Sequence, residues 1–201
     1  MGGTLYDRAK WQFENLKILS EELRVQMALG RAEARDSIEK ERKALYTYFS
    51  KQKIALEKAN EKHKEGRREF LTCVENLKTS LHDEVPVSSE DYDKYKSNVL
   101  KHIYELEEEV RQNYPLMNLT VQGLLDSFKV KMDAFRVNLA LHDVDNPDKV
   151  EKIKKEFSEK LEDVRKLLSK RENRELKVDN FIENISTSFD HLKQAILELS
   201  K

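Results

Sequence analysis

The chain has 201 residues, 37% of them charged, yet its formal net charge at pH 7 is only −1. This balance lacks the basic excess that dedicated nucleic-acid-binding proteins carry, so we expect no dedicated nucleic-acid binding. Five glycines and three prolines leave few interruptions, and strong helix formers dominate. The composition therefore predicts an all-α protein with long helices.

Cysteine content and hydropathy predict a cytoplasmic protein. Cys73 is the only cysteine, so an intramolecular disulfide is excluded, and we interpret it as a small core residue. No stretch approaches the roughly 20 apolar residues of a membrane-spanning helix, and the N-terminus lacks the apolar core of a secretory signal.

The first helical tract is expected to run from about residue 4 to about residue 83. Gly30 is the expected bend, at which residues 4–29 separate as a helix of their own. From Leu45 onward, positions spaced by alternating fours and threes form a heptad-like stripe, which is typical of a helix packed along a partner helix. The stripe continues through Phe49, Gln52, Leu56, Ala59, His63, Gly66, Phe70, Cys73 and Leu77.

The second helix is predicted between two proline-containing segments. Pro86 ends the first tract, and Ser88 or Ser89, followed by acidic residues, supplies the N-cap of the next helix. Pro115 predicts that this helix ends near Asn113. Its apolar face comprises Tyr92, Tyr95, Val99, Ile103, Leu106 and Val110.

Two further helices follow. The third is expected to begin within residues 115–120 and carries apolar residues from Val121 to Leu139. The fourth begins at the sequence Asp145-Asn146-Pro147-Asp148, which combines a capping side chain, a first-turn proline and an early acid. From Leu161 to Leu199 its apolar stripe is regular.

Short loops between these helices predict an elongated antiparallel helical bundle or coiled coil. We expect two regions: residues 1–30, an amphipathic helix that folds back or binds a partner, and residues 31–201, the bundle itself. The bundle would consist of a four-helix head and a two- or three-helix stalk. The head is assigned to residues 60–84, 89–113, 117–143 and 147–172, and the stalk to residues 31–60 and 173–200.

No catalytic or metal-binding motif is present. The sequence contains no Gly-rich phosphate loop, no nucleophile elbow and no pair of cysteines at metal-binding spacing. None of the five histidines has a glutamate three residues before it, which a di-iron helical bundle would require. We therefore expect a non-enzymatic protein without a metal or cofactor.

One group of polar residues interrupts the apolar stripes. His63 and Gly66 on the first tract, and Arg171 and Glu175 on the last helix, are predicted to lie at the same height, where head meets stalk. The neighbouring basic residues include Arg67, Arg68 and Arg174. We call these residues the polar waist. They form either a binding site for an anion or acidic partner, a set of polar contacts that fixes the register of the helices, or simply a solvated surface.

The N-terminal helix carries two apolar stripes on nearly opposite faces. The first contains Leu5, Ala9, Phe13, Leu16, Leu23 and Met27, and the second contains Trp11, Ile18, Val25 and Leu29. Packing within the chain can bury one stripe. The second stripe is a candidate partner-binding face, unless both stripes are buried in the same chain.

These features predict a scaffolding or interaction protein that binds another protein, such as a cytoskeletal coiled coil, or a copy of itself through helical faces. The alternative is a lipid-binding or membrane-surface bundle, similar in kind to apolipoproteins or BAR domains. The narrow heptad-like stripes favour helix partners over lipid.

Overall fold

The computed structural model describes residues 5–58, 64–114, 118–144, 146–152, 154–155, 159 and 162. Within these ranges, side chains are described for residues 17–54, 68–114, 120–144 and from 146 onward. This part of the chain is 88% helical and contains no strand, which confirms the prediction of an all-α protein.

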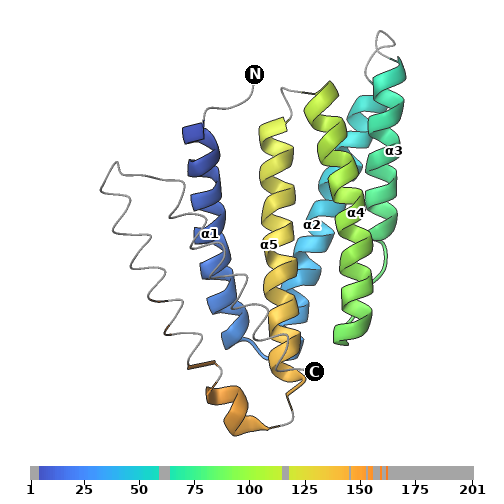
Figure 1. The fold of residues 1–201 in the computed structure, drawn as a ribbon. Coiled ribbons are helices and arrows are strands. Elements are labelled where there is room, and N and C mark those ends of the chain that lie inside the picture. Colours follow the sequence, from blue (N-terminus) through green and yellow to red (C-terminus); the bar gives the residue numbers. More distant parts are fainter. Residues whose placement is uncertain are drawn as a thin grey trace. The chain divides into compact units, whose positions relative to one another are not determined.

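The described elements are five helices and a shorter helical segment at residues 147–152 (Figure 1). The helices are α1 (Leu5–Ala28), α2 (Arg31–Lys58), α3 (Lys64–Ser80), α4 (Ser89–Asn113) and α5 (Asn118–His142). The chain forms two compact units, one made of residues 35–132 and the other of residues 1–34 together with 133–201.

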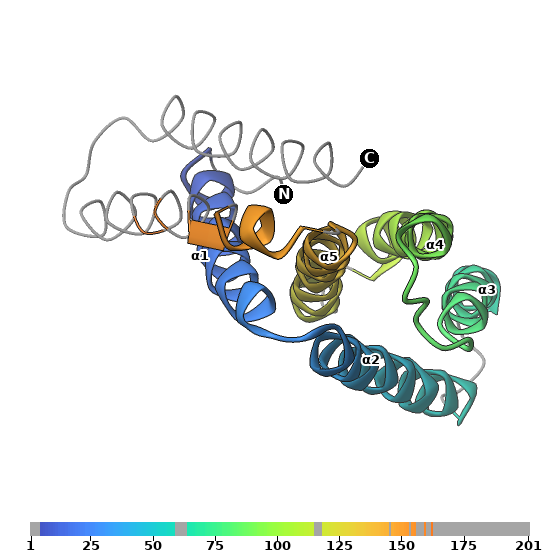
Figure 2. The same cartoon turned by 90° about the horizontal axis from the view of Figure 1, so that it is seen from below.

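Residues 35–132 contain four antiparallel helical segments from α2, α3, α4 and α5. The α2 and α3 helices run in opposite directions, because Lys53 pairs with Glu75 (2.9 Å) while Arg35, at the other end of α2, pairs with Glu84 (2.6 Å). Figure 2, which looks roughly along the helix axes, shows α3 between α2 and α4.

Contacts from α5 complete this arrangement. The Tyr92 hydroxyl on α4 donates a hydrogen bond to the Met132 carbonyl (2.9 Å), and the Lys129 ammonium group contacts Glu107 on α4 (2.7 Å). On its other side, α5 reaches α2 through an ion pair between Lys131 and Glu41 (2.5 Å). Residues 35–132 therefore form a four-helix bundle in which each helix has two neighbours.

The bundle has a continuous apolar core to which all four helices contribute. Each fully buried side chain of this kind stabilises the fold by about 1.5–3 kcal/mol relative to an exposed one. The members with no exposed surface are Phe49, Phe70, Val74, Leu77, Leu81, Tyr92, Val99, Ile103, Leu106, Leu125 and Met132.

The prediction of one helix from residue 31 to about residue 83 is wrong. The chain reverses between α2 and α3, so α2 joins the bundle instead of forming a stalk at 31–60. The fourth helix of the bundle is α2, whereas the segment at 147–152, expected in the head, belongs to the other unit. The arrangement of head and stalk is not confirmed, and residues 173–200 lie outside the described residues.

The composition of the predicted stripe explains this correction. Between Phe49 and Phe70, three of the five stripe positions are Gln52, His63 and Gly66, which offer little apolar surface to a partner helix; Leu56 and Ala59 are the other two. Reversal of the chain instead brings both phenylalanines, each with no exposed surface, into a single core. Long-range packing therefore outweighs the local helical pattern.

Most predicted helix ends are confirmed. Gly30 separates α1 from α2, and its N–H donates to the Glu33 carboxylate (3.1 Å), one half of a capping box. Ser88 caps α4 by accepting a hydrogen bond from the Asp91 N–H (3.2 Å), and α4 ends at Asn113 as expected. Asn146 caps the next helical segment through the Lys149 N–H (3.1 Å).

In the other unit, the last turns of α5 hold the end of α1. The Asn138 side-chain amide donates to the carbonyl of Gln26 (2.6 Å), in the last turn of α1, and to that of Leu29 (3.1 Å), which follows the helix. Arg31 at the start of α2 forms an ion pair with Asp143 (2.5 Å). The two hydrogen bonds from Asn138 satisfy carbonyl groups that a helix end otherwise leaves unpaired.

Candidate functional site

The α1 helix has an apolar face that is not buried by the described fold. Ile18 is 42% exposed and Val25 is 44% exposed, although both are large aliphatic residues. Leu23 and Met27, predicted on the first stripe, are buried, and so is Leu19. The two stripes of α1 thus differ in burial where their side chains are described.

The two ends of the second stripe differ in what the structure describes. The backbone of Trp11 is part of α1, but the structure does not describe its side chain. Leu29 follows the last residue of α1 and is half-buried, and its carbonyl accepts from Asn138 and contacts the His142 ring (3.3 Å). Leu29 is therefore part of the turn after α1 that is hydrogen-bonded to α5. The exposed part of the second stripe consists of Ile18 and Val25.

The predicted polar waist is largely outside the described residues. His63, Arg171, Arg174 and Glu175 are not described, and for Arg67 only the backbone on α3 is. Arg68 is exposed on α3. The waist was predicted on one continuous helix, but α2 and α3 run in opposite directions, as the pairs Lys53–Glu75 and Arg35–Glu84 show.

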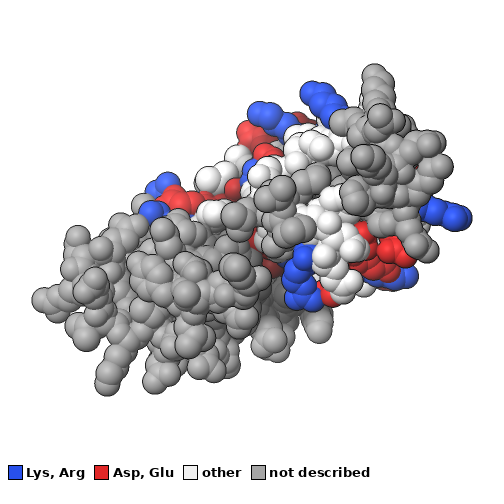
Figure 3. Space-filling model, turned by 90° about the horizontal axis from the view of Figure 1, so that it is seen from above, with Lys and Arg blue, Asp and Glu red and all other residues white. Residues whose placement is uncertain are grey.

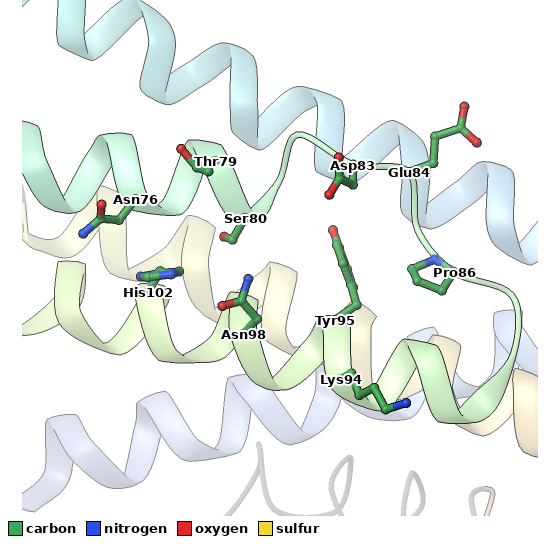
Figure 4. A pocket seen from close by; sticks show the side chains of 10 residues that line it. All are labelled: Asn76, Thr79, Ser80, Asp83, Glu84, Pro86, Lys94, Tyr95, Asn98 and His102. Carbon is green, nitrogen blue, oxygen red and sulfur yellow. The ribbon is translucent and has the colours of Figure 1, made fainter.

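A cleft that the sequence did not predict lies between α3, the segment that follows it, and α4. Its volume is about 620 Å³. The α3 helix contributes Asn76, Thr79 and Ser80, the connecting segment contributes Asp83, Glu84 and Pro86, and α4 contributes Lys94, Tyr95, Asn98 and His102. Figure 4 shows Ser80 and Asn98 facing each other between α3 and α4 and Tyr95 extending toward Asp83, whereas Glu84 points away from α4.

Hydrogen bonds within the helices fix which groups of the cleft can donate. The Thr79 hydroxyl donates to the Glu75 carbonyl (2.9 Å) and the Ser80 hydroxyl to the Leu77 carbonyl (2.8 Å). Both hydroxyl protons are therefore engaged within α3, and only oxygen lone pairs remain for a ligand.

The imidazole of His102 is oriented by a neighbouring carboxylate. Its Nδ1 lies 3.0 Å from Oε2 of Glu105, one turn further along α4. A carboxylate only accepts hydrogen bonds, so Nδ1 carries the proton in the neutral ring and Nε2 is left as an acceptor. The cleft is consequently rich in acceptors.

Two residues of α2 bind the segment that connects α3 and α4. Arg42, which is 7% exposed, donates to the carbonyls of Leu81 and His82 at the end of α3, and it also pairs with Glu39 (2.8 Å). Glu39 in turn accepts a hydrogen bond from the Val85 N–H (2.5 Å). The segment from α3 to α4 is therefore held by a buried ionic network.

The surroundings shift the pKa of two groups in this region. Burial acts to raise the pKa of the Glu39 carboxyl, but hydrogen bonds from Arg42 and the Val85 N–H outweigh it and hold the pKa below its ordinary value. Burial raises the pKa of the Tyr95 hydroxyl, whose oxygen is enclosed and has no hydrogen-bond partner among the described residues. Tyr95 remains a neutral phenol at physiological pH.

Cys73 does not behave as an activated nucleophile. It is half-buried in α3, and burial, followed by the nearby carboxylates of Glu109 and Glu105, raises the pKa of its thiol. The reactive form of cysteine is the thiolate, so this environment favours the unreactive thiol.

Charged residues of both signs are intermixed on the surface. On the face in Figure 3, basic and acidic side chains of the described residues lie close together instead of forming separate patches. Pairs such as Lys94 with Glu90 (2.7 Å) show the same mixing on α4. Among the described residues, no cluster of His, Cys, Asp or Glu is placed to hold a metal ion, and no helix is long and apolar enough to cross a membrane.

Comparison with known proteins gives no match, whether with family models, curated proteins or solved structures.

Proposed function

We propose that this protein is a non-enzymatic interaction or scaffolding protein that binds a helix of another protein, or of a second copy of itself, through α1. The observation that carries the proposal is the exposure of Ile18 and Val25 on a helix whose other apolar stripe is buried. Apolar side chains exposed together on one helix face commonly mark a contact surface.

The spacing of the exposed residues supports a helical partner. Ile18 and Val25 are seven residues apart and therefore lie on the same face of α1, two turns from each other. Trp11 precedes Ile18 by another seven residues in the sequence. A narrow seam of this period matches the stripe of a second helix.

The charges beside this seam favour protein over lipid. Arg24 and Glu21 form an exposed ion pair (3.1 Å), and Lys17 and Glu22 add one charge of each sign. Amphipathic helices that bind anionic membranes are instead enriched in lysine and arginine on their polar face. Flanking charges of mixed sign are typical of helix pairs, in which they select the partner.

The test compares the intact protein with the double variant Ile18→Gln, Val25→Gln. Glutamine favours helix and adds no charge, so the variant removes apolar contact without disturbing α1. Sedimentation velocity over a range of concentrations measures self-association, and a protein captured from the source cells is then purified and titrated directly. We expect the double variant to weaken whichever association is found by at least tenfold.

The matched control is Ile54→Gln, which changes an isoleucine of α2 that is 52% exposed. This variant should associate as the intact protein does. Equal association by the double variant and the intact protein would contradict the proposal. The proposal would also be contradicted if the protein neither self-associates nor binds another protein but binds vesicles of phosphatidylcholine and phosphatidylserine. The exposed face of α1 would then be a lipid-binding surface.

A further inference from the structure

We infer that the cleft between α3 and α4 binds a small organic cation, namely an ammonium group on an aliphatic arm. The cleft lies wholly within residues 35–132 and does not include α1, so this inference is independent of the proposed function. Its volume of about 620 Å³ falls within the range of about 300–1,000 Å³ that is usual for small-molecule sites.

The first argument is the direction of the hydrogen bonds that the cleft can make. The hydroxyls of Thr79 and Ser80 have their protons engaged within α3, so their oxygens can only accept hydrogen bonds from a ligand. Asp83 adds carboxylate oxygens, whereas the Glu84 carboxylate is bound to Arg35. A ligand that satisfies these groups must supply several N–H donors, as an ammonium group does.

The second argument is charge. The lining contains the carboxylates of Asp83 and Glu84 and a single ammonium group, that of Lys94. Lys94 is bound to Glu90 outside the lining (2.7 Å), and Glu84 to Arg35 (2.6 Å). Asp83 is exposed, and its carboxylate lies 3.3 Å from the ring of the neighbouring His82. The lining therefore favours a positive ligand over a negative one.

The third argument is the apolar part of the lining. The Tyr95 ring and Pro86 lie beside the polar groups, and Tyr95 extends from α4 toward the connecting segment (Figure 4). These two residues offer a surface for the methylene arm of an alkylamine, and an aromatic face also attracts a cation. Two asparagines, Asn76 and Asn98, can orient toward either end of such a ligand.

The same chemistry is found in a free diamine or polyamine and in the side chain of a lysine on a partner protein. The probes are 1,4-diaminobutane, spermidine and Nα-acetyl-lysine amide. The neutral control is 1,4-butanediol, which has the same arm without charge, and the anionic control is butanedioate. Binding is followed by the backbone and asparagine side-chain amide signals in two-dimensional NMR.

We expect 1,4-diaminobutane to shift signals of Ser80, Asp83 and Asn98 saturably and the two control compounds to leave them unchanged. Asp83→Asn should weaken binding by about tenfold, the usual effect of losing one charged hydrogen-bond partner. Lys94→Gln should tighten binding, because it removes the ammonium group of the lining. Tighter binding of spermidine would identify a free polyamine as the source, and tighter binding of the lysine derivative a protein side chain.

The control variant is Glu69→Gln, which removes one negative charge from an exposed position of α3 outside the lining. Asp83, Lys94 and Glu69 are all exposed, so each variant should fold. Equal weakening by Asp83→Asn and Glu69→Gln would overturn the inference, because the attraction would then be unspecific. Equal binding of 1,4-butanediol or of butanedioate would overturn it as well.

Discussion

The helices α4 and α1 are nearly equal in length, at 25 and 24 residues, but they use their apolar residues differently. The apolar stripe of α4 is buried in the core, where Tyr92, Val99, Ile103, Leu106 and Val110 are at most 1% exposed. The α1 helix buries Leu23 completely and leaves Ile18 and Val25 exposed. A sequence therefore reveals how many apolar faces a helix has, but only the fold reveals how many of them are covered.

The largest effect is expected from a substitution that leaves a cavity in the core face of α4. Ile103 has no exposed surface, so Ile103→Ala should lower the free energy of unfolding by about 2–5 kcal/mol. Ile54→Ala, the same change at a side chain that is 52% exposed, should alter it by about 0.5 kcal/mol or less. Urea denaturation followed by circular dichroism measures both variants, and similar losses would contradict the assignment of Ile103 to the core.

A smaller effect is expected from the network that anchors the segment before α4. Glu39→Gln removes the carboxylate that binds Arg42 and the Val85 N–H, and it should cost about 1–3 kcal/mol at pH 7. Because the folded state lowers the pKa of Glu39 from its ordinary value of 4.5, this stability is present above that value and is lost as the pH falls through the lowered pKa.

The difference between the intact protein and Glu39→Gln should therefore shrink as the pH is lowered below about 4.5. Denaturation curves at pH 7, 4.5 and 3 give the comparison. Glu108→Gln is the control, since Glu108 pairs with Arg111 on the exposed surface of α4 and its loss should have no measurable effect. A Glu39 effect that stays constant down to pH 3 would show that the carboxylate does not stabilise this segment.

Local signals were sufficient to predict most helix ends. Ser88, Gly30 and Asn146 act on backbone groups a few residues away, so the sequence alone identifies them as ends. The antiparallel arrangement of α2 and α3 depends instead on long-range packing, in which Phe49 and Phe70 are both completely buried. No proline lies between the two helices in the sequence to indicate it.

The cleft could not have been predicted for the same reason. Asn76 and Asn98 each look like an ordinary solvated helix position, and they line one cleft only because α3 and α4 are antiparallel neighbours. The hint was the polar pair Asn98 and His102, which lies one turn apart directly beside the apolar stripe of α4. Glu39 and Arg42 look like an ordinary ion pair within one helix, and the sequence does not indicate their contacts with backbone groups of a distant segment.

The comparison between α1 and α4 is tested most directly by the stability of α1 itself. Trp11 is the only tryptophan and lies in α1, so its fluorescence reports unfolding of this helix. Denaturation of Ile18→Gln, Val25→Gln should give a free energy of unfolding within about 0.5 kcal/mol of the intact protein, whereas Leu23→Ala should lose about 2–5 kcal/mol. If the double variant loses as much as Leu23→Ala in a protein that sediments as a monomer, Ile18 and Val25 are core residues and the contact face proposed for α1 does not exist.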